Sequence, residues 1–324
     1  MDPFMARVAV VILTHFFNDH IRQLFERLTS EAPEGYQVFI NINCGANSLD
    51  MPKAALPHAD HIHLCNFRQI MALPYPAKVD PAGWNGLGWK MPGHEDTNML
   101  CFYKNYPDFD YYWGIEYDVH FEGHWSFLFR HFEQSRADIL ATALYNAAET
   151  PKKILNPLVR NPEGDIPEPE FLVRGFYPLF RASNRFLAAV DAAYRMGWTG
   201  HYEVAWGTLA KSMGYEIEDI GGTGAYVKPH NRNAFYFNTP ATPSMSPGTF
   251  VFRPSFLFPH KQENTLWHPI KPDGVFNWHV SNAEKPFPKN LVHAIKPYLW
   301  QAVIWLWFIF CRRAPRKPDR IRQG

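Results

Sequence analysis

Cysteine is scarce in this sequence of 324 residues, and the four that occur stand far apart. None forms a C-x-x-C pair, the spacing typical of redox motifs and of thiolate zinc sites. The pattern argues against a zinc site of that kind and against the disulfide framework of a small secreted protein. We therefore expect a protein of a reducing, cytoplasmic compartment. The four residues are Cys44, Cys65, Cys101 and Cys311.

Net charge is also nearly absent. Lys and Arg number 32 against 31 for Asp and Glu, which gives a formal charge of +1. Without an overall positive field or a basic patch in the body of the chain, we expect no nucleic-acid partner. The hydrophobic fraction of 46% is large enough for the core of one large domain or of two small ones.

What is present is an alternation of strand and helix patterns. A continuous, largely β-branched run is typical of a buried parallel strand, and apolar residues at helical spacing follow it. The alternation predicts an α/β fold with a Rossmann-type, mostly parallel sheet flanked by helices, which binds ligands at its carboxyl edge. We predict strands over 7–15, 36–43, 58–65 and 111–119, helices over 18–32, 98–107 and 124–142, and a Pro-, Gly- and Trp-rich loop over 66–98.

Two acids end the fourth predicted strand. Glu116 and Asp118 are two residues apart, so on an extended chain both side chains point to one face and Tyr117 points to the other. Paired carboxylates form a hard-oxygen site for Mg²⁺ or Mn²⁺, which in turn carries substrate phosphates. The alternative is a strand end with two solvated acids.

Glu116-Tyr117-Asp118, at the end of a strongly apolar strand, resembles the D-x-D-type motif of the GT-A glycosyltransferases. The resemblance extends over roughly residues 6 to 275, and it implies a GT-A-like fold and a UDP- or GDP-linked sugar donor. In that superfamily the final acid contacts the metal, and the first contacts the ribose or a metal-bound water. Asp118 is thus the expected metal ligand, and Glu116 an expected donor-binding or metal residue. Glu in place of the first Asp is a departure from the pattern.

A second acid follows a Gly-rich turn. Glu203 opens a predicted helix whose apolar positions Val204, Leu209 and Met213 are expected to face inward. Inverting GT-A enzymes carry a general base in an acidic motif at such a helix start, so the resemblance implies that Glu203 is the catalytic base and His201 a neighbour in the acceptor pocket. The alternative is that Glu203 only stabilises the positive end of the helix.

Two histidines lie near the far end of the expected domain. GT-A enzymes often complete the metal shell with a late His, and His268 or His260 fits that role. We favour His268 because Trp267 and Pro269 flank it. Lys271 is expected to pair with the pyrophosphate of the donor as a point charge.

Polar residues also end the first two predicted strands. Thr14 and His15 stand where the base or ribose of a nucleotide lies in this fold, and Asn41 stands at the end of the second strand. We interpret these three as donor-binding candidates, with ordinary strand ends as the alternative.

The C-terminal segment differs from the rest of the chain. Residues 298–311 are apolar except for Gln301 and contain three Trp, and six Lys and Arg follow. Fourteen residues are too few for a spanning helix, which needs about 20. The pattern predicts an amphipathic, monotopic helix whose basic tail binds an anionic membrane surface, at the cytoplasmic face of the inner membrane. The alternative is a closing helix of the core.

These observations predict four segments: a leader added to the natural chain (1–5), a nucleotide-sugar half (6–125), an acceptor half (126–280) and a membrane-association segment (281–324). The predicted function is an inverting, Mn²⁺- or Mg²⁺-dependent glycosyltransferase acting on a lipid-linked glycan or glycolipid of a bacterial envelope. One alternative is a nucleotidyltransferase or another metal-dependent phosphoryl-transfer enzyme, although residues 13–20 lack the Gly and Lys of a phosphate loop. The other is a non-catalytic carbohydrate-binding or membrane scaffold protein.

Overall fold

The computed structural model describes residues 6–44, 51–78, 95–146, 159–237, 248–252, 255–256, 258–259 and 261–271. The chain forms two compact units that alternate along the sequence. The first unit comprises residues 1–117, 125–220 and 224–226, and the second comprises residues 118–124, 221–223 and 227–324. The functional division into 6–125 and 126–280 stays a prediction.

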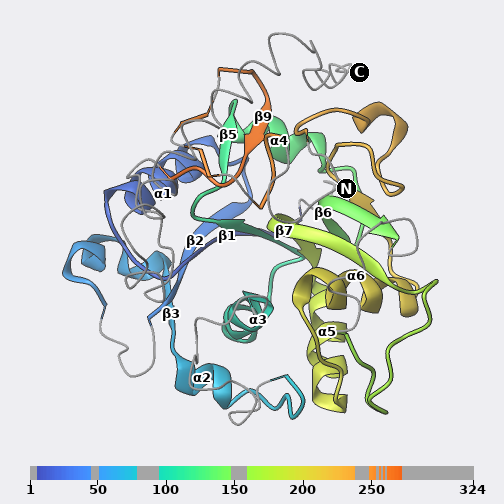
Figure 1. The fold of residues 1–324 in the computed structure, drawn as a ribbon. Coiled ribbons are helices and arrows are strands. Elements are labelled where there is room, and N and C mark those ends of the chain that lie inside the picture. Colours follow the sequence, from blue (N-terminus) through green and yellow to red (C-terminus); the bar gives the residue numbers. More distant parts are fainter. Residues whose placement is uncertain are drawn as a thin grey trace, which may run out of the picture. The chain divides into compact units, whose positions relative to one another are not determined.

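A mixed, mostly parallel sheet of seven strands, in the order β3-β2-β1-β4-β7-β6-β8, is the centre of the first unit (Figure 1). The strands are β1 (Val8–Thr14), β2 (Tyr36–Asn43), β3 (Ile62–Cys65), β4 (Tyr111–Glu116), β6 (Ile139–Asn146), β7 (Val173–Ser183) and β8 (Ile217–Asp219). The helices are α1 (Asp19–Glu31), the 3-10 helix η1 (Lys53–His61), α2 (Phe67–Met71), α3 (Glu95–Asn105), α4 (Trp125–His131), α5 (Asn184–Met196) and α6 (Tyr202–Ser212).

The strand directions bring several strand ends to one edge. β1 is parallel to both β2 and β4, and Leu13 of β1 lies in register with Asn41 on one side and Glu116 on the other. β3 continues the parallel arrangement, whereas β7 is antiparallel to both β4 and β6. The carboxyl ends of β1, β2 and β4 therefore meet at the edge where an open α/β sheet binds its ligands.

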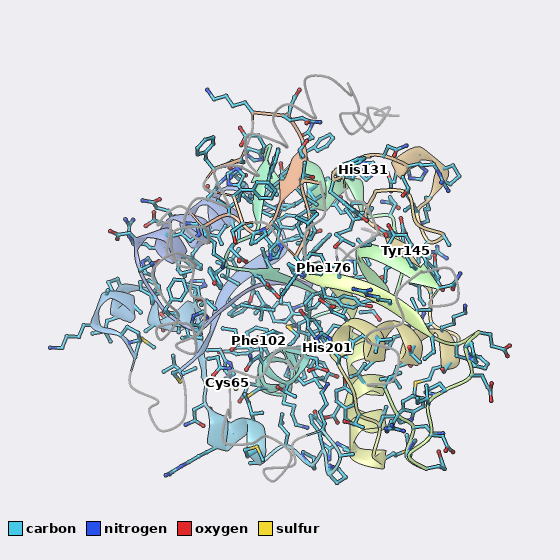
Figure 2. The ribbon with its side chains drawn as sticks, viewed as in Figure 1. Cys65, Phe102, His131, Tyr145, Phe176 and His201 are labelled. Atoms are coloured by element: carbon cyan, nitrogen blue, oxygen red, sulfur yellow. The ribbon has the colours of Figure 1, made fainter. Side chains whose placement is uncertain are left out.

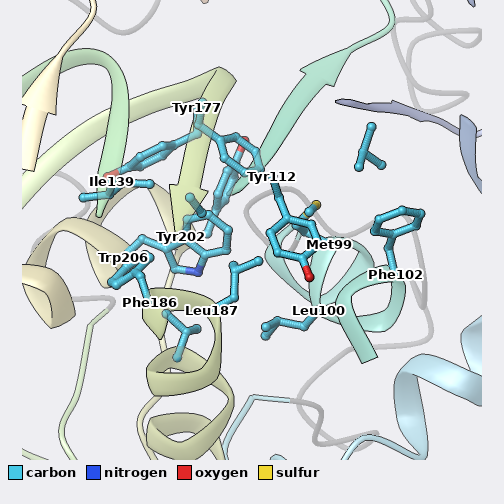
Figure 3. Close-up of a cluster of buried hydrophobic side chains, with 14 of the residues drawn as sticks. Met99, Leu100, Phe102, Tyr112, Ile139, Tyr177, Phe186, Leu187, Tyr202 and Trp206 are labelled. Carbon is cyan, nitrogen blue, oxygen red and sulfur yellow. The ribbon is translucent and has the colours of Figure 1, made fainter. Parts of the chain in front are cut away.

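Both faces of the sheet are covered. Successive residues of β4 point to opposite faces, and Tyr112 contacts Tyr103 of α3 while Trp113 contacts Phe129 of α4, with ring centroids 5.5 and 5.3 Å apart. α3, α5 and α6 lie together on one face (Figure 1). There Trp206 of α6 packs edge-on against a ring of α5 in the cluster shown in Figure 3. All seven residues of β1 are buried, as its apolar run predicts.

The sequence-based prediction of a helix over 124–142 is wrong in its second half. α4 ends at His131, and β6 begins at Ile139. Arg181 of β7 is buried and donates hydrogen bonds to the carbonyl oxygens of Phe132 and Ser135, at 2.7 and 2.8 Å. These carbonyls follow the end of α4 and gain their hydrogen bonds from the sheet, so the chain turns there into the next strand.

Two smaller expectations also fail. The predicted loop over 66–98 contains the short helix α2, whose N-cap Asn66 forms a capping box with Gln69, and α3 already begins at Glu95. Met213, expected to face inward, is the C-cap of α6 and is 40% exposed. The helix therefore ends before its next inward position.

The second unit contains a two-stranded antiparallel sheet of β5 (His120–Glu122) and β9 (Thr265–Trp267), as well as the 3-10 helix η5 (Pro229–Asn231). One hydrophobic cluster of this unit consists of Val251, Phe256, Trp267 and Ile270. The amide of Ile270 donates a 2.8 Å hydrogen bond to the carbonyl of Asp118, which joins the segment after β9 to the turn before β5.

Among the described residues, no helix combines the length and the apolarity needed to cross a membrane. The predicted membrane-association segment, 281–324, lies outside the described residues.

Gly207 lies where α6 packs against the backbone of β7. A Cβ at this position would lie 2.8 Å from the backbone oxygen of Val173, which cannot move without disturbing the strand. Helix propensity favours Ala by about 1 kcal/mol, but the clash costs about 1–3 kcal/mol. We expect Gly207→Ala to lower the free energy of unfolding by up to about 2 kcal/mol in urea denaturation. The exposed Ser212→Ala control should change it by less than about 0.5 kcal/mol.

Candidate active site

Glu116 is the last residue of β4, at the carboxyl edge of the sheet. The hydroxyl of Tyr202, the first residue of α6, donates a hydrogen bond of 3.3 Å to Glu116 Oε1. Burial, followed by the nearby Glu116, raises the pKa of Tyr202 well above its ordinary value, so this phenol stays protonated and acts as a donor. Tyr202 thus links the strand-end acid to the helix that carries Glu203.

A second acid, Glu95, lies close enough to Glu116 for the two carboxyl groups to interact electrostatically. Glu95 opens α3 and accepts a 2.7 Å hydrogen bond from the side-chain amide of Asn98. Burial and then the charge of Glu116 raise the pKa of Glu95 to about 7. A carboxyl that titrates near neutral pH can accept or donate a proton under physiological conditions.

Asn98 is in turn held by buried side chains of β2 and β3. Asn43 Nδ2 donates to Asn98 Oδ1 at 3.1 Å, and Asn41 Nδ2 donates to the Asn98 carbonyl at 3.0 Å. His63 Nδ1 donates to Asn41 Oδ1 at 2.9 Å, and burial lowers the pKa of His63 to about 4, which keeps the ring neutral. Both ends of the Asn41 amide are therefore engaged within the unit. Its role in this structure is to position Asn98, and the donor-binding role predicted for it stays untested.

Thr14 and His15 end β1 at the same edge. The Thr14 hydroxyl forms hydrogen bonds with the backbone of Phe16, donating to its carbonyl at 3.0 Å and accepting from its amide at 3.3 Å. His15 is exposed, and its ring contacts Phe16 and Tyr117 edge-on, with centroids 4.9 and 5.5 Å apart. Phe16 and Tyr117 are half-buried, and the donor-binding role predicted for Thr14 and His15 stays a prediction.

Glu203 lies in the first turn of α6, next to Tyr202. His201 is the N-cap of this helix, and its Nδ1 accepts a 3.3 Å hydrogen bond from the Glu203 amide. Figure 2 shows His201 on the face of the sheet that α3 covers. The structure thus confirms that Glu203 opens a helix, and it gives His201 a capping role.

Asp118 lies in the second unit, in the turn that follows β4 and precedes β5. β4 ends at Glu116, so the strand predicted over 111–119 is three residues too long and its alternation does not reach Asp118. The carboxylate is 5% exposed. Lys271 Nζ donates to Oδ2 at 2.6 Å, and His268 Nε2 lies 3.4 Å from Oδ1. Burial alone would raise the pKa of Asp118, but His268 and Lys271 outweigh it and lower the pKa below its ordinary value.

The orientation of His268 is that of a metal ligand. Its Nδ1 lies 2.9 Å from the carbonyl oxygen of Val251, and a carbonyl only accepts, so Nδ1 carries the proton. In the neutral ring Nε2 then presents a lone pair toward Asp118 Oδ1, a buried oxygen that receives no well-aligned hydrogen bond from the described residues. Two acceptors face each other favourably only when a cation or a proton lies between them.

The donor set fits a divalent metal. Asp118 and His268 carry ligand atoms within 4.8 Å of one another, and Glu116, two residues before Asp118 in the chain, is a third candidate. Carboxylate oxygens suit Mg²⁺, Ca²⁺ and Mn²⁺ and imidazole suits Zn²⁺, Fe²⁺ and Ni²⁺, so this donor set selects a divalent ion without selecting one metal. His260, the alternative to His268, lies outside the described residues.

The sequence pattern gives no role to Tyr202 or Asn98, and residues 94–96 allow two interpretations, a sugar or acceptor contact and a solvated helix N-terminus. A lone Tyr in a helix start carries no spacing signal, and the pair Glu95-Asp96 resembles the ordinary acidic first turn of a helix. Only the fold, in which β1 lies between β2 and β4 and α3 contacts β2, shows that these side chains converge.

Comparison with known proteins does not identify a family. No protein-family model matches the sequence, and no curated protein gives a significant match. The chain is similar in structure to the apo form of mouse xyloside xylosyltransferase 1, with 6% identity and a TM-score of 0.36, covering 67% of this chain and 85% of that one. It is also similar to mannose-1-phosphate geranyltransferase from Thermus thermophilus, with 13% identity and a TM-score of 0.25, covering 63% and 59%. Both similarities are too remote to assign a substrate or a reaction.

The raised pKa of Glu95 predicts a pH dependence of stability. The folded protein holds this proton up to about pH 7, whereas the unfolded chain releases it near its ordinary value of 4.5. The stability associated with the protonated carboxyl is complete below pH 4.5 and is lost as the pH rises through 7. Glu95→Gln has no proton to lose, so its unfolding free energy at pH 8 should exceed that of the parent by about 1–3 kcal/mol.

Urea denaturation at pH 4.5 and pH 8 measures this difference. The two proteins should be nearly equal at pH 4.5, and the exposed Glu163→Gln control should track the parent at both values. A Glu95→Gln variant that is less stable than the parent at pH 8 would show that Glu95 is buried as a stabilising carboxylate.

Proposed function

We propose that this protein is a metal-dependent glycosyltransferase that moves a sugar from a nucleotide-sugar donor to an acceptor hydroxyl. The arrangement around Asp118 carries the proposal. A buried carboxylate oxygen faces Nε2 of a histidine whose Nδ1 is fixed by the Val251 carbonyl. A site of this kind holds a divalent cation, and a cation beside Lys271 suits a diphosphate.

Two further features support a sugar-nucleotide substrate. The acidic sequence Glu116-Tyr117-Asp118 follows a central strand of an open, mostly parallel sheet, as in the GT-A superfamily that the sequence resembles. The exposed ring of His15 and the half-buried rings of Phe16 and Tyr117 lie at the end of β1, where a nucleobase would stack. This combination favours the transferase over the scaffold alternative, which needs no cation site.

Each residue then has a definite task. When bound, the divalent ion offsets the charge that develops on the departing diphosphate. Asp118 and His268 would hold the ion, and Lys271 would contribute a positive charge to the same phosphates. Glu203 accepts the proton of the acceptor hydroxyl, a role that requires an inverting reaction. Tyr202 keeps Glu116 oriented at the strand end.

The nature of the acceptor is proposed from the sequence alone. The Trp-rich residues 298–311 and the basic residues after them are typical of a segment that lies on an anionic membrane. We infer a lipid-linked glycan or glycolipid acceptor, handled at the cytoplasmic face of the inner membrane.

Asp118→Asn should abolish the response to metal while the fold survives, because Asn keeps the size of the side chain and removes the charge that holds the cation. The measurement is the shift in melting temperature on adding Mn²⁺ together with UDP- or GDP-sugars, since a ligand of the folded state stabilises it. The parent should shift and Asp118→Asn should not. Glu122→Gln, which changes another carboxylate of the second unit, should respond like the parent.

Glu203→Gln should lower transfer to an acceptor by about 10²–10⁴-fold while donor binding stays close to normal, because a general base acts only in the transfer step. Single-turnover transfer and donor affinity are measured side by side. The exposed Glu216→Gln is the matched control. Release of inorganic pyrophosphate in place of a nucleoside diphosphate would instead identify a nucleotidyltransferase, and near-normal transfer by Glu203→Gln would remove the general base from the proposal.

A further inference from the structure

The turn between α5 and α6 is rich in glycine, which favours flexibility, yet the position of Glu203 depends on it. It contains Gly197, which ends α5 with a φ of 111°, and Gly200, with a φ of 133°. Side chains other than Gly rarely adopt these values, and Gly loses the most conformational entropy when it is ordered. A turn of this composition therefore needs external contacts to hold one conformation.

Paired backbone hydrogen bonds with Arg160 hold Thr199, and two further contacts come from the segment before residue 79. Thr199 Oγ1 donates a 2.7 Å hydrogen bond to the carbonyl of Ala77. Lys78 Nζ donates a 2.5 Å hydrogen bond to the carbonyl of Gly200, the residue directly before the N-cap His201. A lysine far away in sequence thus binds the residue that precedes the cap of α6.

Lys78 is itself held by a buried acid. Its ammonium lies 2.8 Å from Asp96 Oδ2, and both side chains are 0% exposed. Tyr194 of α5 donates its hydroxyl to the same carboxylate, and the ammonium lies 4.9 Å from the centre of the Tyr194 ring. The Asp96 carboxylate also accepts the amide of Thr97 at 2.9 Å. The Lys78 ammonium is thus surrounded by the Asp96 carboxylate, the Gly200 carbonyl and the Tyr194 ring.

A contribution to the stability of the fold does not by itself explain why the Lys78–Asp96 ion pair is buried. Desolvation offsets most of the attraction between two such charges, and apolar side chains of the same volume often serve the fold equally well. An apolar pair, however, has no donor for the Gly200 carbonyl. What the ammonium adds is a directed hydrogen bond to the residue that precedes the α6 cap.

We propose that the buried Lys78–Asp96 pair is a positioning device that fixes the Gly200 carbonyl and, through it, the first turn of α6 that carries Glu203. This inference rests on the proposed function, because it makes the pair important for transfer through the general base. Lys78 and Asp96 are positioning residues, and neither is assigned a contact with substrate.

The test replaces both charges together, because removing one partner alone leaves a buried charge that could prevent folding. In Lys78→Met/Asp96→Asn the volumes are kept, and Asn still accepts from Tyr194. Hydrogen–deuterium exchange of the amides of residues 201–205 is measured first, on the full chain. We expect faster exchange there and unchanged exchange in α5. Lys104→Met, which breaks the Lys104–Asp191 pair, is the control and should leave residues 201–205 protected.

Transfer to acceptor is then compared with metal-dependent hydrolysis of the donor. A displaced base should lower transfer on the order of 10²-fold, while the hydrolysis that does not need the acceptor proton stays within roughly threefold of the parent. In a Glu203→Gln background the double replacement should cause no further loss of transfer, because residues that act as a unit are not additive.

Unchanged exchange at residues 201–205 overturns the inference and leaves the proposed function standing. Additive losses in the Glu203→Gln background also overturn it, since they show that the pair acts elsewhere. If Glu203→Gln itself transfers normally, the proposed base is wrong, whereas faster exchange in the double variant would still establish that the pair holds the start of α6.

Discussion

The need of buried charged groups for partners constrains the structure of the first unit more than any other requirement. A carboxylate withdrawn from water needs a hydrogen-bond donor or a positive charge beside it. The two acids at the start of α3, Glu95 and Asp96, have different partners of this kind. Asp96 takes an ammonium and a phenol, and Asp96 is fully buried. Glu95 takes only a side-chain amide and keeps its proton to a higher pH. Neighbouring residues thus acquire a structural and a titrating role from their surroundings alone.

Strand direction decides which of these acids can serve chemistry. Because β1, β2 and β4 run parallel, their carboxyl ends and the start of α3 lie at one edge of the sheet. The antiparallel β7 runs the other way, so the chain crosses the sheet once more before α5 and α6 return it to the same face as α3. Tyr202 meets Glu116 there only because of this reversal. The base proposed from sequence and the acid at the strand end are connected by topology rather than by any local motif.

The sequence predicts those parts of the structure that depend on local pattern. β2 has the predicted bounds 36–43, and β1 falls within the predicted 7–15, because a continuous apolar run has no alternative to burial. The local sequence pattern does not predict the structure where a residue distant in sequence determines it. Arg181 ends the helical stretch after His131, and Lys78, in a segment with no recognisable signal, binds the residue that precedes the cap of α6. At the metal site, Asp118 and His268 follow from family resemblance, whereas the ring orientation that supports metal binding depends on the Val251 carbonyl and is visible only in the fold.

Charge balance at Asp118 also bears on how the proposed cation binds. Lys271 already neutralises the carboxylate through Oδ2, and His268 adds no negative charge in either protonation state. A divalent ion placed at Oδ1 therefore brings a net positive charge into a buried site, which is unfavourable without further anions. The diphosphate of a nucleotide sugar carries those anions, and Mg²⁺-like ions are commonly held by one or two carboxylates together with substrate phosphates. On the proposed function, metal and donor therefore bind cooperatively, because each supplies the charge that the other lacks.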